Sequence, residues 1–330
     1  MSIGGDAGAP ALVTGGTGVL GAQVVALLLQ RGVPVIATSS RGETKLLGER
    51  HDGLVLERCD VRDTAAMEQL IRRHRAGLVI HLAALMPAVC RERPAEAVDV
   101  NVTATAGLYA AAAQAGVQRF VYASSKSAYG PELPPVYGPP EYRPISEDTP
   151  ARPVYMYDVT KRAGELVIEA QRRVGGPQAT SLRFATVYGP GKGSRFGGAS
   201  VLSAMIEAAI DGGAFALPRG GDQVDDVIWV GDAAEGVVRA ALHPAALQPL
   251  YNISTGKGIT IREFAAHVSA LFPQARLEIG PGLRYMGDEP TYGVLDAARA
   301  GIDLGLRIDP DPRRGVLLFA QALRALRERG

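Results

Sequence analysis

The segment that most constrains this chain is TGGTGVLG at residues 14–21, a glycine-rich stretch between an apolar strand pattern and an apolar helix pattern. Residues 11–13 before it and 24–29 after it are almost wholly apolar, which predicts a strand, a tight turn and a helix in one buried unit. Gly15 allows the turn, Gly18 lets a pyrophosphate approach the backbone, and Gly21 lets the helix pack against the strand. The open N–H groups at the helix start would receive the anion.

The rest of the chain alternates short apolar stretches with longer amphipathic ones, which is typical of a doubly wound α/β fold with helices on both faces of a parallel sheet. Strands are predicted near residues 11–13, 33–38, 54–59, 78–82, 119–123 and 180–183, and helices near residues 19–31, 64–74, 95–115 and 157–174. Residues 131–153 contain eight of the 22 prolines, so they are expected to form an irregular loop with a function.

The pattern loosens into glycine-rich loops and short elements after residue 188. We therefore expect residues 1–187 to form a Rossmann dinucleotide-binding domain, with residues 224–254 returning to it. Residues 188–330 are expected to form a smaller C-terminal substrate-binding lobe.

Composition describes an ordinary globular protein, with 47% apolar residues, 21% charged residues and a formal net charge of +1. Because there is no basic surplus, we expect no nucleic-acid partner, and because no apolar run is long enough to span a bilayer, we expect no membrane segment. Two cysteines, Cys59 and Cys90, are expected to stay reduced, which favours a cytoplasmic setting. No metal site is predicted.

Two further motifs carry the chemistry. Tyr157 and Lys161 are four residues apart at the start of a predicted helix, so they share a face, and a neighbouring ammonium lowers the pKa of a phenol. Ser125 follows the fifth predicted strand, where a hydroxyl would point into the crevice in which doubly wound sheets bind ligands. Serines in such places also serve simply as turn formers.

In this order the three motifs resemble the extended short-chain dehydrogenase/reductase family, which includes nucleotide-sugar epimerases and dehydratases, and the resemblance covers nearly the whole chain. It implies hydride transfer between a secondary alcohol and a ketone, with Tyr157 as the acid or base. Lys161 would lower the pKa of Tyr157 and bind the nicotinamide ribose, and Ser125 would orient the substrate oxygen.

The resemblance also implies a set of cofactor contacts along the chain. Asp60 would contact the adenine, although it would equally suit a helix cap. Asn101 matches the helix asparagine that supports the active site. The full set implied for the cofactor is Gly15, Thr17, Gly18, Val19, Leu20, Gly21, Ser39, Arg41, Asp60, Val61, Leu82, Ala83, Ala84, Asn101, Tyr157, Lys161, Phe184, Thr186 and Val187.

Cofactor choice depends on the end of the second predicted strand. Enzymes that use NAD commonly place an acid there to bind the ribose 2′-hydroxyl, and that acid would repel a 2′-phosphate. This chain has Ser39, with Arg41 two residues on. A small donor and a guanidinium suit a phosphate, so we expect NADP rather than NAD, with a solvated loop charge as the other interpretation of Arg41.

Three functions fit these motifs: an oxidoreductase on a small hydroxyl or keto compound, a sugar or nucleotide-sugar epimerase that retains its cofactor, and a non-catalytic dinucleotide sensor. The intact Ser125, Tyr157 and Lys161 argue against the sensor. Dehydratases of the family carry an Asp-Glu pair where this chain has Lys126 and Ser127, so dehydration is not expected. The oxidoreductase is the main expectation, and the epimerase is its alternative.

Substrate contacts are expected from two places. Ser125, Lys126 and Ser127 end the fifth strand, and the glycine-rich loop at 189–198 carries Lys192 and Arg195, which would meet an anionic or polar group. Related nucleotide-sugar epimerases bind the diphosphate through an arginine where this chain has Asp225, which predicts a compact substrate without a nucleotide.

The other interpretation of Asp225 is that an arginine elsewhere compensates, with Arg219 and Arg284 as the candidates. Helices 95–115 and 157–174 are further expected to pair two copies of the chain into a homodimer. The first of these helices is rich in alanine, which allows close approach but also suits packing on the sheet.

Overall fold

A computed structural model describes residues 9–42, 45–47, 51–192, 200–286 and 293–328. Its centre is a seven-stranded parallel sheet with the strand order β11-β6-β5-β4-β1-β2-β3. The strands are β1 (Ala11–Thr14), β2 (Val35–Ser39), β3 (Leu54–Arg58), β4 (Leu78–His81), β5 (Arg119–Ser125), β6 (Gln178–Phe184) and β11 (Leu250–Ile253). Every residue of β1 and β4 is buried, as expected for apolar strands covered on both faces. The predicted doubly wound sheet is confirmed.

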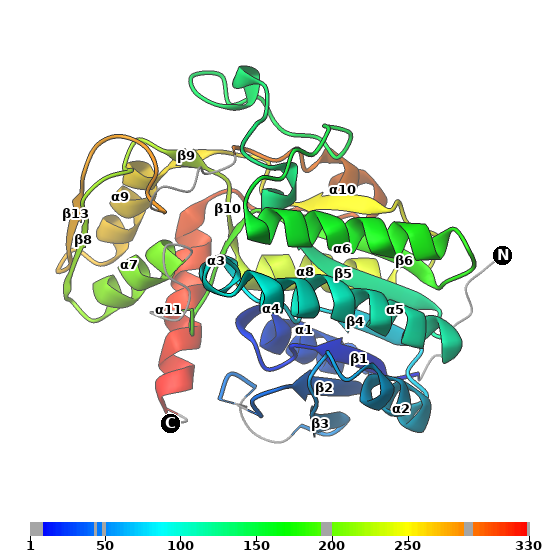
Figure 1. Ribbon diagram of the computed structural model, residues 1–330. Helices are drawn as coiled ribbons and strands as arrows, with labels where there is room; N and C mark the ends of the chain where they lie inside the picture. The colour runs from blue at the N-terminus through cyan, green and yellow to red at the C-terminus, as the bar shows by residue number, and fades with distance from the viewer. Residues whose placement is uncertain (1–8, 43–44, 48–50, 193–199, 287–292, 329–330) are drawn as a thin grey trace.

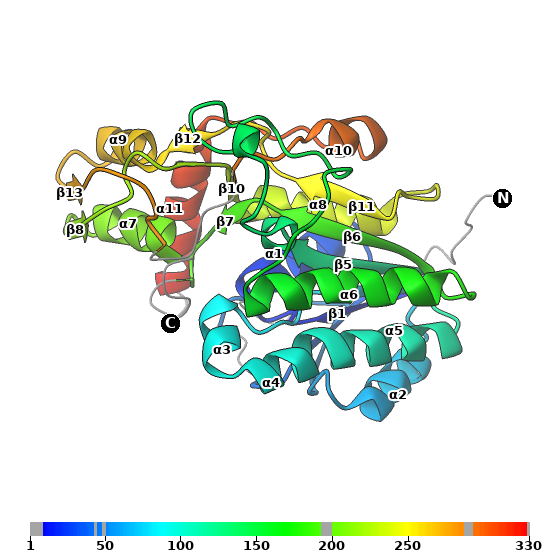
Figure 2. The same cartoon turned by 45° about the horizontal axis from the view of Figure 1, so that its top comes forward.

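Helices cover both faces of this sheet (Figures 1 and 2). On one face α1 (Val19–Gln30) packs beside α8 (Val230–Leu242), and their apolar side chains share one core cluster with the sheet. On the other face lie α2 (Thr64–His74), α5 (Ala104–Gln114) and α6 (Met156–Arg172), which enclose a second cluster. The helices predicted at 19–31, 64–74 and 157–174 match these elements within two residues.

The segment predicted as one helix at 95–115 is not a single continuous α-helix in the structure. It consists of α4 (Pro94–Val98), a π-helical turn η1 (Asp99–Thr103) and α5, preceded by the short α3 (Pro87–Glu92). Asn101 lies in the π turn and is 1% exposed, with its side chain bonded to the backbone of Leu85. A π turn inside a helix often marks a functional position, and propensity alone gives no sign of it.

A third core cluster lies at one end of the molecule, on the left in Figure 1, and we call the part built on it the small lobe. Its elements include α7 (Val201–Ile210), β8 (Ala214–Leu217), α9 (Ile261–Leu271), β13 (Arg276–Ile279) and α11 (Pro312–Glu328). Its centre contains the aromatic side chains of Tyr188, Trp229, Phe264 and Phe319, which contact one another at tilted or edge-to-face angles with ring centroids 5.5 to 6.1 Å apart. Three two-stranded sheets join β7 (Thr186–Tyr188) to β10 (Val227–Trp229), β9 (Val224–Asp225) to β12 (Ile259–Thr260), and β8 to β13.

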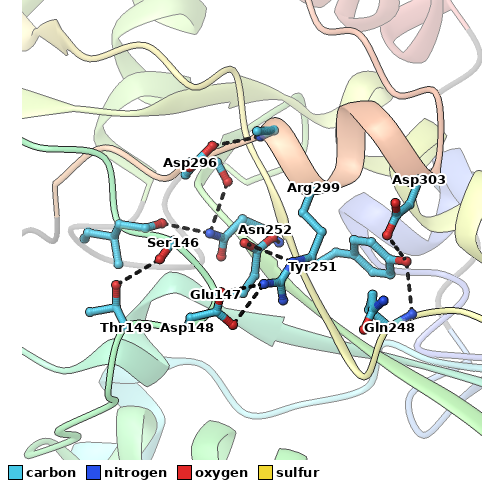
Figure 3. Close-up of polar contacts among 12 residues, drawn as sticks. Ser146, Glu147, Asp148, Thr149, Gln248, Tyr251, Asn252, Asp296, Arg299 and Asp303 are labelled. Atoms are coloured by element: carbon cyan, nitrogen blue, oxygen red, sulfur yellow. Dashed lines mark hydrogen bonds and ion pairs between the residues drawn. The ribbon is translucent and has the colours of Figure 1, made fainter.

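The proline-rich loop at 131–153 is irregular, as predicted, apart from the short turn η3 (Pro135–Tyr137). Its last part is anchored to β11 and to α10 (Ala298–Asp303), as Figure 3 shows. Glu147 accepts a hydrogen bond from the backbone of Asn252 at 2.8 Å, and Arg299 pairs with Asp148 at 2.8 Å. The Asn252 side chain donates to the Ile145 carbonyl at 2.9 Å. These bonds hold the loop over the carboxyl end of the sheet.

In the described part of the chain, no helix combines the length and the apolar character needed to cross a bilayer.

Candidate functional site

The glycine-rich turn between β1 and α1 forms a cradle, a backbone surface on which a Cβ at the glycine positions would clash with neighbouring atoms. Gly15 has a left-handed φ of 65°, and a Cβ there would lie 2.9 Å from the backbone nitrogen of Ala83. A Cβ on Gly21 would overlap the Gly15 carbonyl oxygen. Gly18 is exposed and begins α1 without a side-chain cap, so the N–H groups of the first turn face outward. The residues present therefore fit the pyrophosphate of a dinucleotide.

The segment after β4 lies directly against this turn. The hydroxyl of Thr14 accepts hydrogen bonds from the backbone N–H groups of Leu82 and Ala83, at 3.2 and 3.3 Å. The same hydroxyl meets Nδ1 of the buried His81 at 2.7 Å. These bonds join the glycine-rich turn and residues 82–84 into one wall, which is the arrangement that the predicted cofactor contacts require.

Ser125, Tyr157 and Lys161 meet at the carboxyl end of the sheet. Ser125 ends β5, while Tyr157 and Lys161 lie on the first turns of α6. The side chains of Ser125 and Tyr157 are hydrogen-bonded to each other. The Lys161 ammonium donates to the Ala123 carbonyl at 2.8 Å and lies 5.8 Å from the centre of the Tyr157 ring.

Burial dominates the electrostatics of this group. It raises the pKa of Tyr157 above its ordinary value, and the hydrogen bond with Ser125 opposes the rise. Burial also lowers the pKa of Lys161 to about 8. The direction of the Tyr157 pKa shift is therefore opposite to the predicted lowering, because burial disfavours the phenolate.

Asn101 holds α6 against the segment after β4. Its side-chain oxygen accepts from the N–H of Leu85 at 2.7 Å, and its amide donates to the Leu85 carbonyl and to the Thr160 hydroxyl, both at 3.1 Å. Thr160 immediately precedes Lys161 on α6. The position predicted for a supporting asparagine is thus occupied by a residue that joins the two segments.

Lys126 was expected to contact the substrate and Asp225 to face a diphosphate, but in the structure the two side chains contact each other. Both side chains are buried, with 5% and 0% exposed, and they form an ion pair. Asp225 also accepts hydrogen bonds from the hydroxyls of Thr186 at 2.8 Å and Tyr285 at 2.6 Å. The premise that Asp225 presents an uncompensated charge to a diphosphate is therefore wrong, because Lys126 neutralises it inside the protein. Lys126 in turn directs its ammonium to Asp225 rather than into open solvent.

Known proteins are similar to this chain in sequence and in fold. The model of the NAD dependent epimerase/dehydratase family matches residues 11–254, which include the glycine-rich turn, Ser125, Tyr157 and Lys161. The chain belongs to this family. The predicted resemblance to extended short-chain dehydrogenases/reductases is confirmed, and this family member is an enzyme of the epimerase/dehydratase class.

Curated relatives match over most of their length. The UDP-glucose 4-epimerase of Mycolicibacterium smegmatis is 31% identical over 258 residues, which cover 76% of this chain and 79% of that protein. A putative UDP-glucose 4-epimerase of Methanocaldococcus jannaschii is 28% identical over 313 residues, 92% of this chain and 95% of that protein.

Solved structures agree with the fold. The UDP-glucose 4-epimerase of Thermotoga maritima with UDP-glucose superposes with a TM-score of 0.83 at 25% identity, covering 96% of this chain and 99% of that one. The Thermus thermophilus UDP-glucose 4-epimerase in complex with NAD gives 0.79 at 29% identity, with the same coverage.

Ser39 and Arg41, from which the cofactor preference was predicted, lie at the end of β2 and in the turn after it. The hydroxyl of Ser39 accepts hydrogen bonds from the backbone N–H groups of Arg41 and Gly42, at 3.3 and 3.2 Å, so it shapes the turn. The Arg41 side chain is exposed. Asp60 is paired with Arg62 at 2.6 Å, and hydrogen bonds from Arg62 lower its pKa.

Four more of the predicted contact residues are Val61, Phe184, Lys192 and Arg195. Val61 is buried in the core next to α2, and Phe184 ends β6 and is 6% exposed. Lys192 donates a hydrogen bond to the carbonyl of Val187, so its ammonium lies beside the predicted nicotinamide strand. Burial lowers the pKa of this ammonium to about 8. Arg195 lies outside the described residues.

One buried network behind the site was not singled out from the sequence. Glu165, one turn after Lys161, forms a bidentate ion pair with Arg183 of β6 at 2.6 and 2.8 Å. It also accepts a hydrogen bond from the Ser124 hydroxyl at 2.6 Å. The Arg183 guanidinium lies 4.1 Å from the centre of the Tyr129 ring. An arginine within a predicted strand of the sheet was the sequence signal that could have identified this network.

Proposed function

We propose that this chain is an NAD(P)-dependent nucleotide-sugar epimerase that keeps its cofactor through the catalytic cycle. The observation that carries the proposal is the meeting of Ser125, Tyr157 and Lys161 at the carboxyl end of the sheet, next to the glycine-rich cradle. Three of the four relatives described above are named UDP-glucose 4-epimerase and the fourth a putative one, which favours the epimerase over the freely exchanging oxidoreductase.

The reaction uses the three side chains in sequence. Tyr157, as phenolate, takes the proton of a secondary hydroxyl while Ser125 holds the oxygen, and Lys161 offsets the negative charge on the phenol. Bound nicotinamide supplies the acceptor, and later the donor, of the hydride from the same carbon. Once the ketone has turned its other face, Tyr157 returns the proton and the epimer forms.

The diphosphate of such a substrate needs cations, and Arg219 and Arg284 are our candidates. Their segments lie side by side, because the N–H of Gly220 donates to the Pro281 carbonyl at 3.0 Å. Both arginine side chains are exposed. Arg284 has a left-handed φ of 68°, a conformation that costs energy in a non-glycine residue and is often retained at binding sites.

Cofactor preference is a separate proposal. The relatives in solved complexes hold NAD. Ser39 and Arg41 nevertheless stand where an acid would select the ribose 2′-hydroxyl, so we expect tighter binding of NADP than of NAD by titration calorimetry. Arg41→Ala should weaken NADP much more than NAD. Equal affinities of the wild type for both cofactors would contradict this expectation.

The function is tested with purified protein and UDP-glucose. We expect conversion to the C4 epimer at catalytic cofactor concentration, with no net reduction of the cofactor. Arg284→Ala should raise KM for UDP-glucose and leave cofactor affinity unchanged. Stoichiometric reduction of the cofactor by the wild type, with release of a ketone, would instead identify an oxidoreductase.

A further inference from the structure

We propose that Lys126, Asp225 and Tyr285 form an interlobe clamp that keeps the ketone in the site between the two hydride transfers. The clamp rests on the proposed epimerase function. Its three members are positioning residues: they act by holding the site together around the substrate and not by exchanging protons with it.

The clamp is a continuous buried chain of bonds. The Lys126 ammonium pairs with one carboxylate oxygen of Asp225, and the Tyr285 hydroxyl donates to the other at 2.6 Å. The Thr186 hydroxyl shares that second oxygen at 2.8 Å. Asp225 is fully buried and Tyr285 is 4% exposed, so water does not compete for these bonds.

The members come from both parts of the molecule. Lys126 begins the turn η2 (Lys126–Tyr129) at the end of the central strand β5, whereas Tyr285 belongs to the core of the small lobe. Tyr285 is held tightly in that lobe, because a Cβ on Gly220 would overlap its backbone. Asp225, on β9, therefore accepts an ion pair from the end of the central strand and a hydrogen bond from the small lobe.

The same residues flank the reacting position. Lys126 directly follows Ser125, which is bonded to Tyr157, and Thr186 opens the strand on the predicted nicotinamide side. A substrate held between Ser125 and Thr186 would lie under the clamp. Opening the clamp would thus open the site where the ketone is formed.

Stability alone does not explain this ion pair. A buried pair gains little over apolar side chains of the same shape, whereas removing one partner leaves a buried charge at a high cost. The arrangement is better explained by what it holds in place. Lys126 and Tyr285 bind the two oxygens of one carboxylate, so the loss of either bond weakens the link between the lobes.

An epimerase needs such retention for a chemical reason. The first step moves a hydride from carbon to the nicotinamide and a proton from the hydroxyl to Tyr157. The second step returns the hydride to the opposite face of the same carbon and the proton to the ketone oxygen. The net redox change is zero only if the same ketone stays for the second step. If the ketone leaves, the substrate has been oxidised by two electrons and one equivalent of cofactor remains reduced.

The test uses Tyr285→Phe, which removes one hydrogen bond of the clamp and keeps the Lys126–Asp225 pair. With UDP-glucose as the substrate, and with NADP and NAD as cofactors in separate assays, we expect the absorbance of reduced nicotinamide in the near ultraviolet to rise. The released ketone is detected by mass spectrometry after the protein is filtered off. Loss of a hydrogen bond to a charged group predicts about a tenfold to hundredfold increase in ketone released per epimer formed.

The matched control is Tyr251→Phe. It also removes a tyrosine hydroxyl that donates to a carboxylate, here Asp303 at 3.0 Å, on the β11 side of the molecule (Figure 3). We expect this control to release no more ketone than the wild type. A second variant, Lys126→Met with Asp225→Asn, replaces the ion pair by neutral groups and should release ketone as Tyr285→Phe does.

The outcomes separate the two proposals. If the wild type forms the epimer and neither clamp variant releases more ketone than Tyr251→Phe, the clamp is overturned and the epimerase stands. If the wild type forms no epimer of UDP-glucose, the function proposed above fails, and the clamp as stated fails with it. Release of ketone by both clamp variants but not by the control supports the clamp.

Discussion

Tyr157 is the residue on which the proposed chemistry depends, and its environment works against its ionised form. Burial raises its pKa, while Lys161 lies close enough to offset a phenolate once it forms. We expect Tyr157→Phe to lose more than about a thousandfold in kcat, since general acid–base catalysis contributes about 10²- to 10⁴-fold. Cofactor affinity, measured by calorimetry, should be nearly unchanged.

Tyr155→Phe is the control for this substitution, because Tyr155 is 40% exposed and lies two residues earlier, at the start of the same helix. Its turnover should equal that of the wild type. Wild-type turnover in Tyr157→Phe would remove Tyr157 from the mechanism.

His81 makes the stability of the protein depend on pH. Burial lowers its pKa to about 3, and its ring bonds Thr14 and Thr105 on both sides. The Thr105 hydroxyl donates to the Asn101 carbonyl, so it accepts from Nε2 of His81 and leaves Nδ1 without a proton. Below the ordinary pKa of 6.5 the unfolded chain binds a proton that the folded chain refuses, so stability falls as the pH drops from 6.5 towards 3.

The expected loss between pH 7 and pH 5 is about 2 kcal/mol from this residue, at roughly 1.4 kcal/mol per pH unit below 6.5. Urea unfolding at the two pH values measures it. His81→Gln, which cannot titrate, should show a correspondingly smaller difference, whereas His51→Gln, at an exposed position, should behave as the wild type. The same pH difference in His81→Gln and in the wild type would contradict the assignment.

At the scale of the element, the β1–turn–α1 unit depends on contacts that admit no side chain. We expect Gly21→Ala to push α1 away from the turn, because its Cβ would overlap the Gly15 carbonyl. Overpacking of this kind costs about 1–3 kcal/mol, and the displaced N–H groups should bind a dinucleotide more weakly. Thermal unfolding and calorimetric titration measure the two effects.

Gly138→Ala is the control for the turn, since a Cβ there would meet the Pro135 carbonyl at an ordinary 3.6 Å. It should change neither quantity. A Gly21→Ala protein with wild-type stability and cofactor affinity would show that the turn tolerates a side chain.

At the scale of the whole molecule, α6 leaves apolar side chains on its outer face. Val159 and Leu166 are 40% and 50% exposed, and their spacing of seven residues places them on one side of the helix. We propose that this face and α5 pair two copies of the chain, and we expect a dimer by light scattering. Leu166→Glu should give a monomer, while Leu317→Glu, on the similarly exposed Leu317 of α11, should stay dimeric. A monomeric wild type would rule out the pairing.

The sequence by itself determined the sheet and the place of the cofactor cradle. The signals for them are local in the sequence: apolar strand patterns, a glycine turn with fixed spacing, and the helical spacing of Tyr157 and Lys161. Local signals can be recognised without knowledge of the fold. The predicted strands also placed Ser125 near Tyr157 and Lys161, because parallel strands end at one edge of the sheet. The π turn around Asn101 gave no such signal, since it depends on a bond to the distant backbone of Leu85.

Only the tertiary structure decided what the charged residues do. Lys126 and Asp225 are 99 positions apart, and from the sequence one was expected to bind substrate and the other to repel a diphosphate. Folding brings them into one buried pair, which cancels both charges. The physical reason is that a local pattern reports burial and backbone preference, whereas the partner of a charge is set by which segments the fold places side by side.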